Sequence, residues 1–189
     1  MTVAAFTPNP AAVTGTSPAI ADSGVNFAML DNATTPYSGT VGARFTLGMA
    51  ERDKGGNLYR YVQFQSAATA GDIVVTDETY LAVQMTNGAT AGKFGREIGI
   101  ALVTVPADVS STNGYFGWVL IEGLGNVNAA TSATANAVLA STTTAGQIGS
   151  SVAAGTKNLG NIVLTQAGQA SPALTTCRIG SRVTVGTTN

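Results

Sequence analysis

The chain lacks histidine altogether and has one cysteine, Cys177, among its 189 residues. The absence of histidine excludes imidazole metal sites and the Ser–His and Cys–His pairs of nucleophilic enzymes. A single cysteine also excludes a disulfide within the chain. These absences favour a protein that binds or assembles over one that uses such chemistry.

Charge is also scarce, since only 10% of the residues are charged, against about 25% in an average soluble domain. The net charge of −1 and nine scattered bases argue against nucleic-acid binding, which needs clustered positive charge. No run of 18 apolar residues is present to span a membrane. The first ten residues lack the basic and apolar segments of a signal peptide, so we expect synthesis in a cytoplasm.

The few charges are unevenly distributed. Residues 123–189 carry only Lys157, Arg178 and Arg182, and the stretch Gly123–Thr156 carries none. One interpretation is a solvated surface of Thr, Ser, Asn and Ala. The other is a surface that faces another protein, where an unpaired charge would be costly. The sequence leaves both open.

Residues 1–43 are rich in proline, alanine and threonine, which predicts an extended N-terminal arm, with one strand near Val25–Leu30. The arm is too apolar for an inert linker. We therefore expect it to become ordered only in an assembly, by contact with a neighbour. The candidate partner-binding residues are Phe6, Pro8, Pro10, Val13, Ile20 and Phe27.

Residues 44–189 predict one all-β domain, a compact β-sandwich or β-barrel of short strands, because turn signals recur about every 8–15 residues. No window keeps the period of a standard helix. Asp53–Asn57 is a Gly-rich turn that would join Arg44–Ala50 and Leu58–Gln65 into a hairpin. The other expected strands are Asp72–Thr76, Thr79–Met85, Ile98–Val105, Tyr115–Ile121, Asn126–Ala129, Ala137–Ser141, Asn161–Gln166, Leu174–Ile179 and Arg182–Val185.

The segment Tyr115–Ile121 is the most strongly strand-like run. Strand alternation predicts that Tyr115, Gly117 and Val119 face away from Phe116 and Trp118. We expect the large apolar residues to form the core or a subunit seam, namely Phe45, Tyr59, Tyr61, Phe64, Phe116, Trp118, Leu120 and Ile121.

A short pattern recurs three times: Thr-Ala-Gly, then a polar residue, then a large apolar one. The three copies end at Ile73, Phe94 and Ile148. Their spacing is unequal, which excludes a solenoid. We interpret each copy as a glycine turn that starts a strand, with the large apolar residue turned inward.

Candidate chemistry is sparse. The acid pairs Asp77/Glu78 and Glu51/Asp53 lie near expected turns, where solvated carboxylates are usual, although a glycosidase pair across a cleft stays open. Asp72 could join Asp77 and Glu78 around a calcium ion. Cys177 is most simply a small buried residue, and Trp118 a core or interface anchor. We therefore expect no catalytic residue, no metal site and no cofactor.

Residues 44–180 resemble a known family in the order of their features. The features are Leu47-Gly48, a polar glycine turn, Leu58–Val62, the Thr-Ala-Gly turns, and Gly160–Leu164. The most telling piece is Gly114-Tyr-Phe-Gly-Trp-Val-Leu-Ile-Glu-Gly123. The chain looks like the small capsid decoration, or cement, proteins of tailed bacteriophages.

That resemblance implies an all-β homotrimer on the outer surface of a virion, made in the host cytoplasm and bound to the major capsid protein. It implies a clamp that stabilises the head, with no enzymatic activity and with neither nucleic acid nor membrane as a partner. The apolar arm could then add a strand to a neighbouring sheet. The alternative is a virion or cell-surface adhesin that binds glycans through exposed aromatics, with Tyr37, Tyr80 or Trp118 as candidates.

Overall fold

The computed structural model describes residues 25–32, 43–87, 97–107, 114–150, 156, 158–167 and 174–180. These residues form twelve strands and no helix, so the prediction of an all-β fold is confirmed. Accordingly, the described part of the chain contains no helix that is long and apolar enough to cross a membrane.

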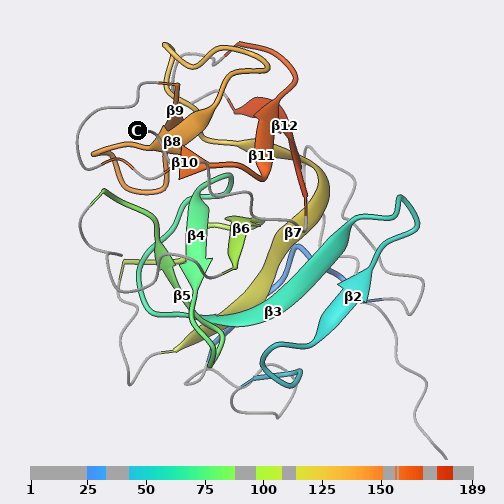
Figure 1. Ribbon diagram of the computed structural model, residues 1–189. Helices are drawn as coiled ribbons and strands as arrows, with labels where there is room; N and C mark the ends of the chain where they lie inside the picture. The colour runs from blue at the N-terminus through green and yellow to red at the C-terminus, as the bar shows by residue number, and fades with distance from the viewer. Residues whose placement is uncertain are drawn as a thin grey trace, which may run out of the picture.

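Five strands close into a small barrel (Figure 1). They run in the order β7-β6-β4-β5-β3, and β3 also pairs with β7 to complete the circuit. Only β3 and β5 are parallel. The five strands are β3 (Leu58–Phe64), β4 (Ile73–Thr76), β5 (Leu81–Gln84), β6 (Ile98–Ala101) and β7 (Tyr115–Val127).

Two short strands lie beside the barrel. β1 (Leu30–Asn32) pairs with the start of β7, and β2 (Ala50–Arg52) pairs with β3. The expected hairpin is thus present, but its first strand is shorter and later than Arg44–Ala50. Gly48, at φ +82°, turns the chain just before β2, and its N–H still donates to the carbonyl of Tyr61.

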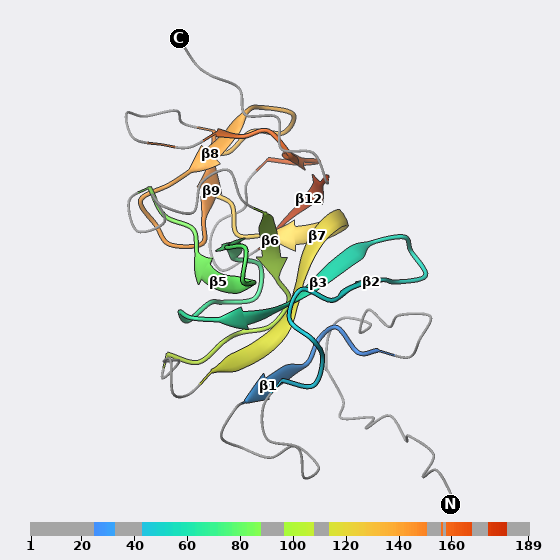
Figure 2. The same cartoon turned by 60° about the horizontal axis from the view of Figure 1, so that its bottom comes forward.

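The remaining strands form a second region, which we call the lobe and define as described residues 128–180. It holds the three-stranded sheet of β8 (Leu139–Ser141), β9 (Ile148–Gly149) and β10 (Asn158–Leu159). It also holds β11 (Ile162–Leu164) and β12 (Thr175–Ile179), which extend the barrel sheet through the second half of β7. Figure 2 shows the lobe on the side of the barrel away from β1.

Strand β7 lies between two hydrophobic clusters. Tyr115, Val119 and Ile121 belong to the barrel interior, together with Val62, Phe64, Val74, Ala82 and Ala101. Phe116 and Trp118 belong to a larger cluster, in which Trp118 packs on the rings of Phe27, Phe45 and Tyr61. The predicted alternation is confirmed over Tyr115–Ile121, where both faces of β7 are buried, which explains the unbroken apolar sequence of that segment.

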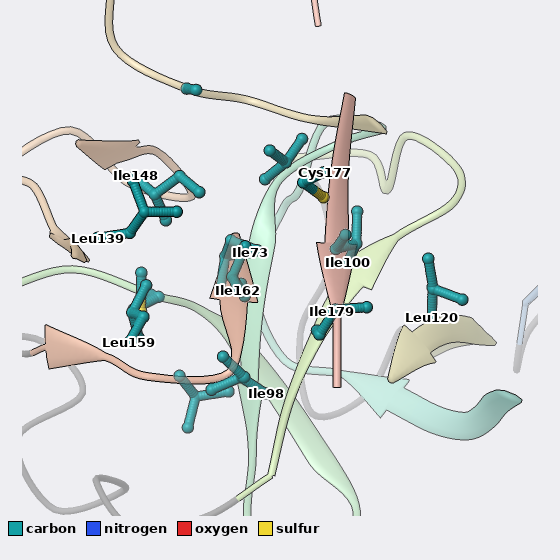
Figure 3. Close-up of a cluster of buried hydrophobic side chains, with 14 of the residues drawn as sticks. Ile73, Ile98, Ile100, Leu120, Leu139, Ile148, Leu159, Ile162, Cys177 and Ile179 are labelled. Carbon is teal, nitrogen blue, oxygen red and sulfur yellow. The ribbon is translucent and has the colours of Figure 1, made fainter. Parts of the chain in front are cut away.

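The larger cluster joins the two regions (Figure 3). Isoleucines from β4 and β6 meet side chains from β8, β9, β11 and β12 there. The aromatic residues expected in the core are buried, with Phe45 partly buried against this cluster. Burial of this apolar surface is the main source of cohesion between barrel and lobe.

Two of the three Thr-Ala-Gly turns lie in the described part of the chain, and both are as predicted. Gly71 and Gly146 have φ values of +93° and +72°. Ile73 and Ile148 follow them, start β4 and β9, and are fully buried. The turn that ends at Phe94 lies outside the described residues. The two turns also meet, because the N–H of Ile73 donates to the carbonyl of Gly146 at 2.8 Å.

Residues 25–32 are part of this fold rather than of a separate arm. The ring of Phe27 stacks on Tyr59 at 4.0 Å and meets Trp118 edge-on at 5.1 Å. Its exposed fraction is 0%. The apolar residues near Val25–Leu30 therefore pack on this chain's own core.

Candidate functional site

Two surfaces of the described structure are candidates for function. The first is a hollow of about 340 Å³ at one end of the barrel, which we call the barrel mouth. Arg60 and Thr76 continue the inward faces of β3 and β4 beyond Val62 and Val74, and so reach this end. The mouth is lined by Arg60, Thr76, Asp77, Glu78, Tyr80 and Glu97.

Arg60 connects three segments of the chain that border the mouth. Its Nε and Nη2 donate to the two carboxylate oxygens of Glu97 at 2.8 and 3.0 Å, and its Nη1 donates to the carbonyl of Gly48 at 2.8 Å. The guanidinium carbon also lies 5.6 Å from the centre of the Tyr80 ring. The pairing is bidentate, which fixes the geometry of both groups. Arg60 therefore joins β3, the residue before β6, and the turn at Gly48.

Asp77 shapes the turn that borders the mouth. Its Oδ1 accepts hydrogen bonds from the backbone N–H groups of Thr79 and Leu81, each at 3.0 Å, and from the Thr79 hydroxyl at 2.7 Å. Tyr80 follows at φ +62°, the left-handed region. These contacts give the Asp77 carboxylate a structural role in the turn.

Asp72 lies elsewhere, at the opposite end of β4 from Asp77. Its exposed fraction is 2%, and its oxygens accept from the Thr69 N–H at 2.7 Å, Gln84 Nε2 at 2.6 Å and Asn128 Nδ2 at 3.0 Å. Asp72 thus ties the barrel to the lobe. It does not join Asp77 and Glu78 in a calcium site, and the described residues hold no group of three possible metal-binding side chains.

The second surface is one face of the sheet formed by β11, β12 and the end of β7. Val163, Arg178 and Leu124 lie opposite one another in the register, in one row across the three strands. All three are exposed, with Leu124 at 59% and Val163 at 42%. We call this row the outer sheet face. Single exposed apolar residues are common, but two that flank one arginine mark a potential protein contact.

The two surfaces differ in charge. Residues 1–122 contain all ten acidic residues and six of the nine bases, a net charge of −4, whereas residues 123–189 contain three bases and no acid. Among the described residues of the lobe, Arg178 is the only charged one. The uncharged stretch Gly123–Thr156 supplies the end of β7, β8 and β9. Much of the surface on this side is therefore neutral, and the barrel is acidic.

The structure bears on one of the partner-binding candidates. Phe27 is enclosed in the core, so it has no surface to offer a partner while the core is intact. Its position between apolar residues in a proline-rich region concealed this role in the sequence. Phe6, Pro8, Pro10, Val13 and Ile20 lie outside the described residues.

Trp118 and Cys177 are both core residues. Trp118 is 1% exposed, so it cannot stack on a sugar in the folded protein. Tyr80 lines the mouth, with Arg60 over its ring. Tyr37 lies outside the described residues. Burial raises the pKa of the Cys177 thiol to about 12, which keeps it protonated and unreactive near neutral pH.

The row of Val163, Arg178 and Leu124 was not recognised from the sequence. Strand alternation could have found it, because Val163 lies between the buried Ile162 and Leu164, and Arg178 between Cys177 and Ile179. The register that aligns the three residues comes only from the fold.

No family model, curated protein or solved structure significantly matches this chain.

Proposed function

We propose that this chain is a structural protein of a tailed-bacteriophage head, a cement protein that binds the outer surface of the major capsid lattice and stabilises it. The observation that carries the proposal is the nearly uncharged lobe together with the outer sheet face, which exposes Leu124 at the end of β7 and Val163 of the lobe. A surface of this kind suits protein contact, because little charge has to be desolvated on binding.

The sequence resemblance supports the same conclusion. Its most specific part, Gly114–Gly123, leads into β7 and supplies its residues up to Gly123, and both hydrophobic clusters contain residues of this strand. The resemblance therefore concerns the residues that determine the fold. A clamp stabilises a shell by binding the assembled lattice more tightly than its separate subunits. Repetition over many sites then multiplies the effect of modest single contacts.

The test uses heads of the phage whose genome encodes this chain, prepared with and without the protein. We expect the protein to copurify with the heads, and heads that lack it to lose their contents at a lower temperature or chaotrope concentration. Adding the purified chain back should restore the resistance. Lysozyme, added at the same concentration, controls for nonspecific protection. Equal resistance of heads with and without the chain would contradict the proposal.

A further inference from the structure

The outer sheet face and the barrel mouth are complementary in charge. The outer sheet face carries one arginine between two apolar side chains, all within residues 123–189, which contain no acid. Among the residues that the structure describes, the mouth is lined by the carboxylates of Asp77, Glu78 and Glu97 and by one base, Arg60. The formal charges of these four described residues sum to −2, opposite in sign to that of Arg178.

The outer sheet face and the barrel mouth lie in different regions of the folded molecule. Strand β4 begins at Ile73, which bonds to Gly146 of the lobe, and ends at Thr76, which lines the mouth. Arg178 is exposed on β12 and is not among the described residues that line the mouth of its own molecule. It is therefore open to contact with the mouth of another molecule.

We propose that copies of this chain associate head to tail, with the outer sheet face of one copy seated over the barrel mouth of the next. Arg178 enters the hollow near Glu78, and Leu124 and Val163 pack against its rim. A face-to-face dimer through two outer sheet faces is disfavoured, because the two-fold axis would bring the Arg178 side chains of both copies together. The contact is thus heterologous, which builds a ring or a filament rather than a simple dimer.

The oligomer proposal is independent of any capsid, so the purified full-length chain tests it. Mass is measured by light scattering and sedimentation over a concentration series. We expect the mass of the wild type in solution to exceed the monomer mass of 18.9 kDa. Arg178→Glu and Glu78→Lys each reverse one charge in the contact, and each should weaken the association at least about tenfold.

The double variant Arg178→Glu, Glu78→Lys is the decisive measurement. It restores opposite charges between copies, so it should assemble more strongly than either single variant. Lys54→Glu makes the same change in charge as Arg178→Glu, at the exposed hairpin tip, and should leave the mass unchanged. Replacing Leu124 and Val163 together by serine should weaken association without changing any charge.

Three results would overturn the proposal: a wild-type chain that stays monomeric throughout, association that resists Arg178→Glu, or a double variant that assembles no better than the single ones. Because the exchanged side chains are exposed or line an open hollow, each variant should fold, and the fluorescence of the buried Trp118 checks this. Failure of the capsid experiment alone would leave these results unchanged, so the two proposals fail separately.

Discussion

The hydroxyl of Tyr61 donates a hydrogen bond of 2.6 Å to Oδ2 of Asp31 and so fastens β1 to the barrel strand β3. The same hydroxyl accepts from the backbone N–H of Arg44 at 3.1 Å, and Arg44 Nε lies 3.1 Å from Asp31 Oδ1. Asp31 is 5% exposed. Burial, followed by the bond to Asp31, raises the pKa of Tyr61, so the hydroxyl keeps its proton and remains a donor.

We predict that Tyr61→Phe lowers the free energy of unfolding by about 1.5–3 kcal/mol, because a buried carboxylate then loses a donor. Urea denaturation measures the change. Hydrogen exchange at residues 30–32 should also become faster, since β1 loses one of its attachments.

Tyr59→Phe is the matched control. Tyr59 lies on the same face of β3, and its hydroxyl donates to Asp53 Oδ2 at 2.8 Å, in the partly exposed hairpin turn. Tyr59→Phe should lower the free energy of unfolding by less than Tyr61→Phe does. It should leave hydrogen exchange at residues 30–32 unchanged. Equal effects of the two variants on β1 would argue against the anchoring role of Tyr61.

Gly146 allows a second test. At φ +72°, a Cβ there would overlap Cγ of the buried Asp72. Gly146→Ala should therefore lower the free energy of unfolding through two effects: backbone strain of about 1–2 kcal/mol and overpacking of about 1–3 kcal/mol. Gly56, at φ +83°, has nothing within 4 Å of that position, so Gly56→Ala should cost the strain alone. Thermal unfolding of both variants separates the two terms, and equal losses would show that Asp72 moves aside freely.

The hairpin turn should make stability depend on pH. Burial raises the pKa of Asp53, but hydrogen bonds from the Asn57 side chain, the Tyr59 hydroxyl and the backbone N–H groups of Asn57 and Gly55 outweigh it, so the net pKa is lowered. The unfolded chain has the ordinary aspartate value of about 3.9. The stability that Asp53 supplies is thus complete above that pH and is lost as pH falls through the lower folded value.

The measurement compares the wild type with Asp53→Asn between about pH 6 and pH 2. Their difference in free energy of unfolding should shrink below pH ~4. Because the other carboxylates titrate in both proteins, they cancel in the difference. A difference that stays constant over the whole range would contradict the lowered pKa.

Local pattern was enough to predict the all-β class, the hairpin turn, the alternation of β7 and the two described Thr-Ala-Gly turns. Each depends on residues adjacent in sequence, such as Gly71 before Ile73. Strand β10 was not predicted, since it has two residues and is defined by its pairing with β8 rather than by its own pattern. Strand β9 was predicted only as the strand that the Thr-Ala-Gly turn before Ile148 starts.

Long-range pairing could not be read from the sequence. The parallel contact of β3 with β5 closes the barrel through only two residue pairs, Gln63 with Leu81 and Phe64 with Ala82. The barrel mouth depends on that closure, and on Arg60 reaching Glu97 across 37 positions of the chain. Likewise, Phe27 is a core residue only because β1 pairs with β7.

Strand β7 gives its first half to the barrel and its second half to the sheet that carries Leu124. A force on the exposed row is therefore transmitted along the backbone of the same strand that closes the barrel. A force applied by a neighbouring molecule would be resisted by the backbone hydrogen bonds that β7 makes with both β3 and β12. The exposed contact residue Leu124 thus lies on the same strand that closes the barrel.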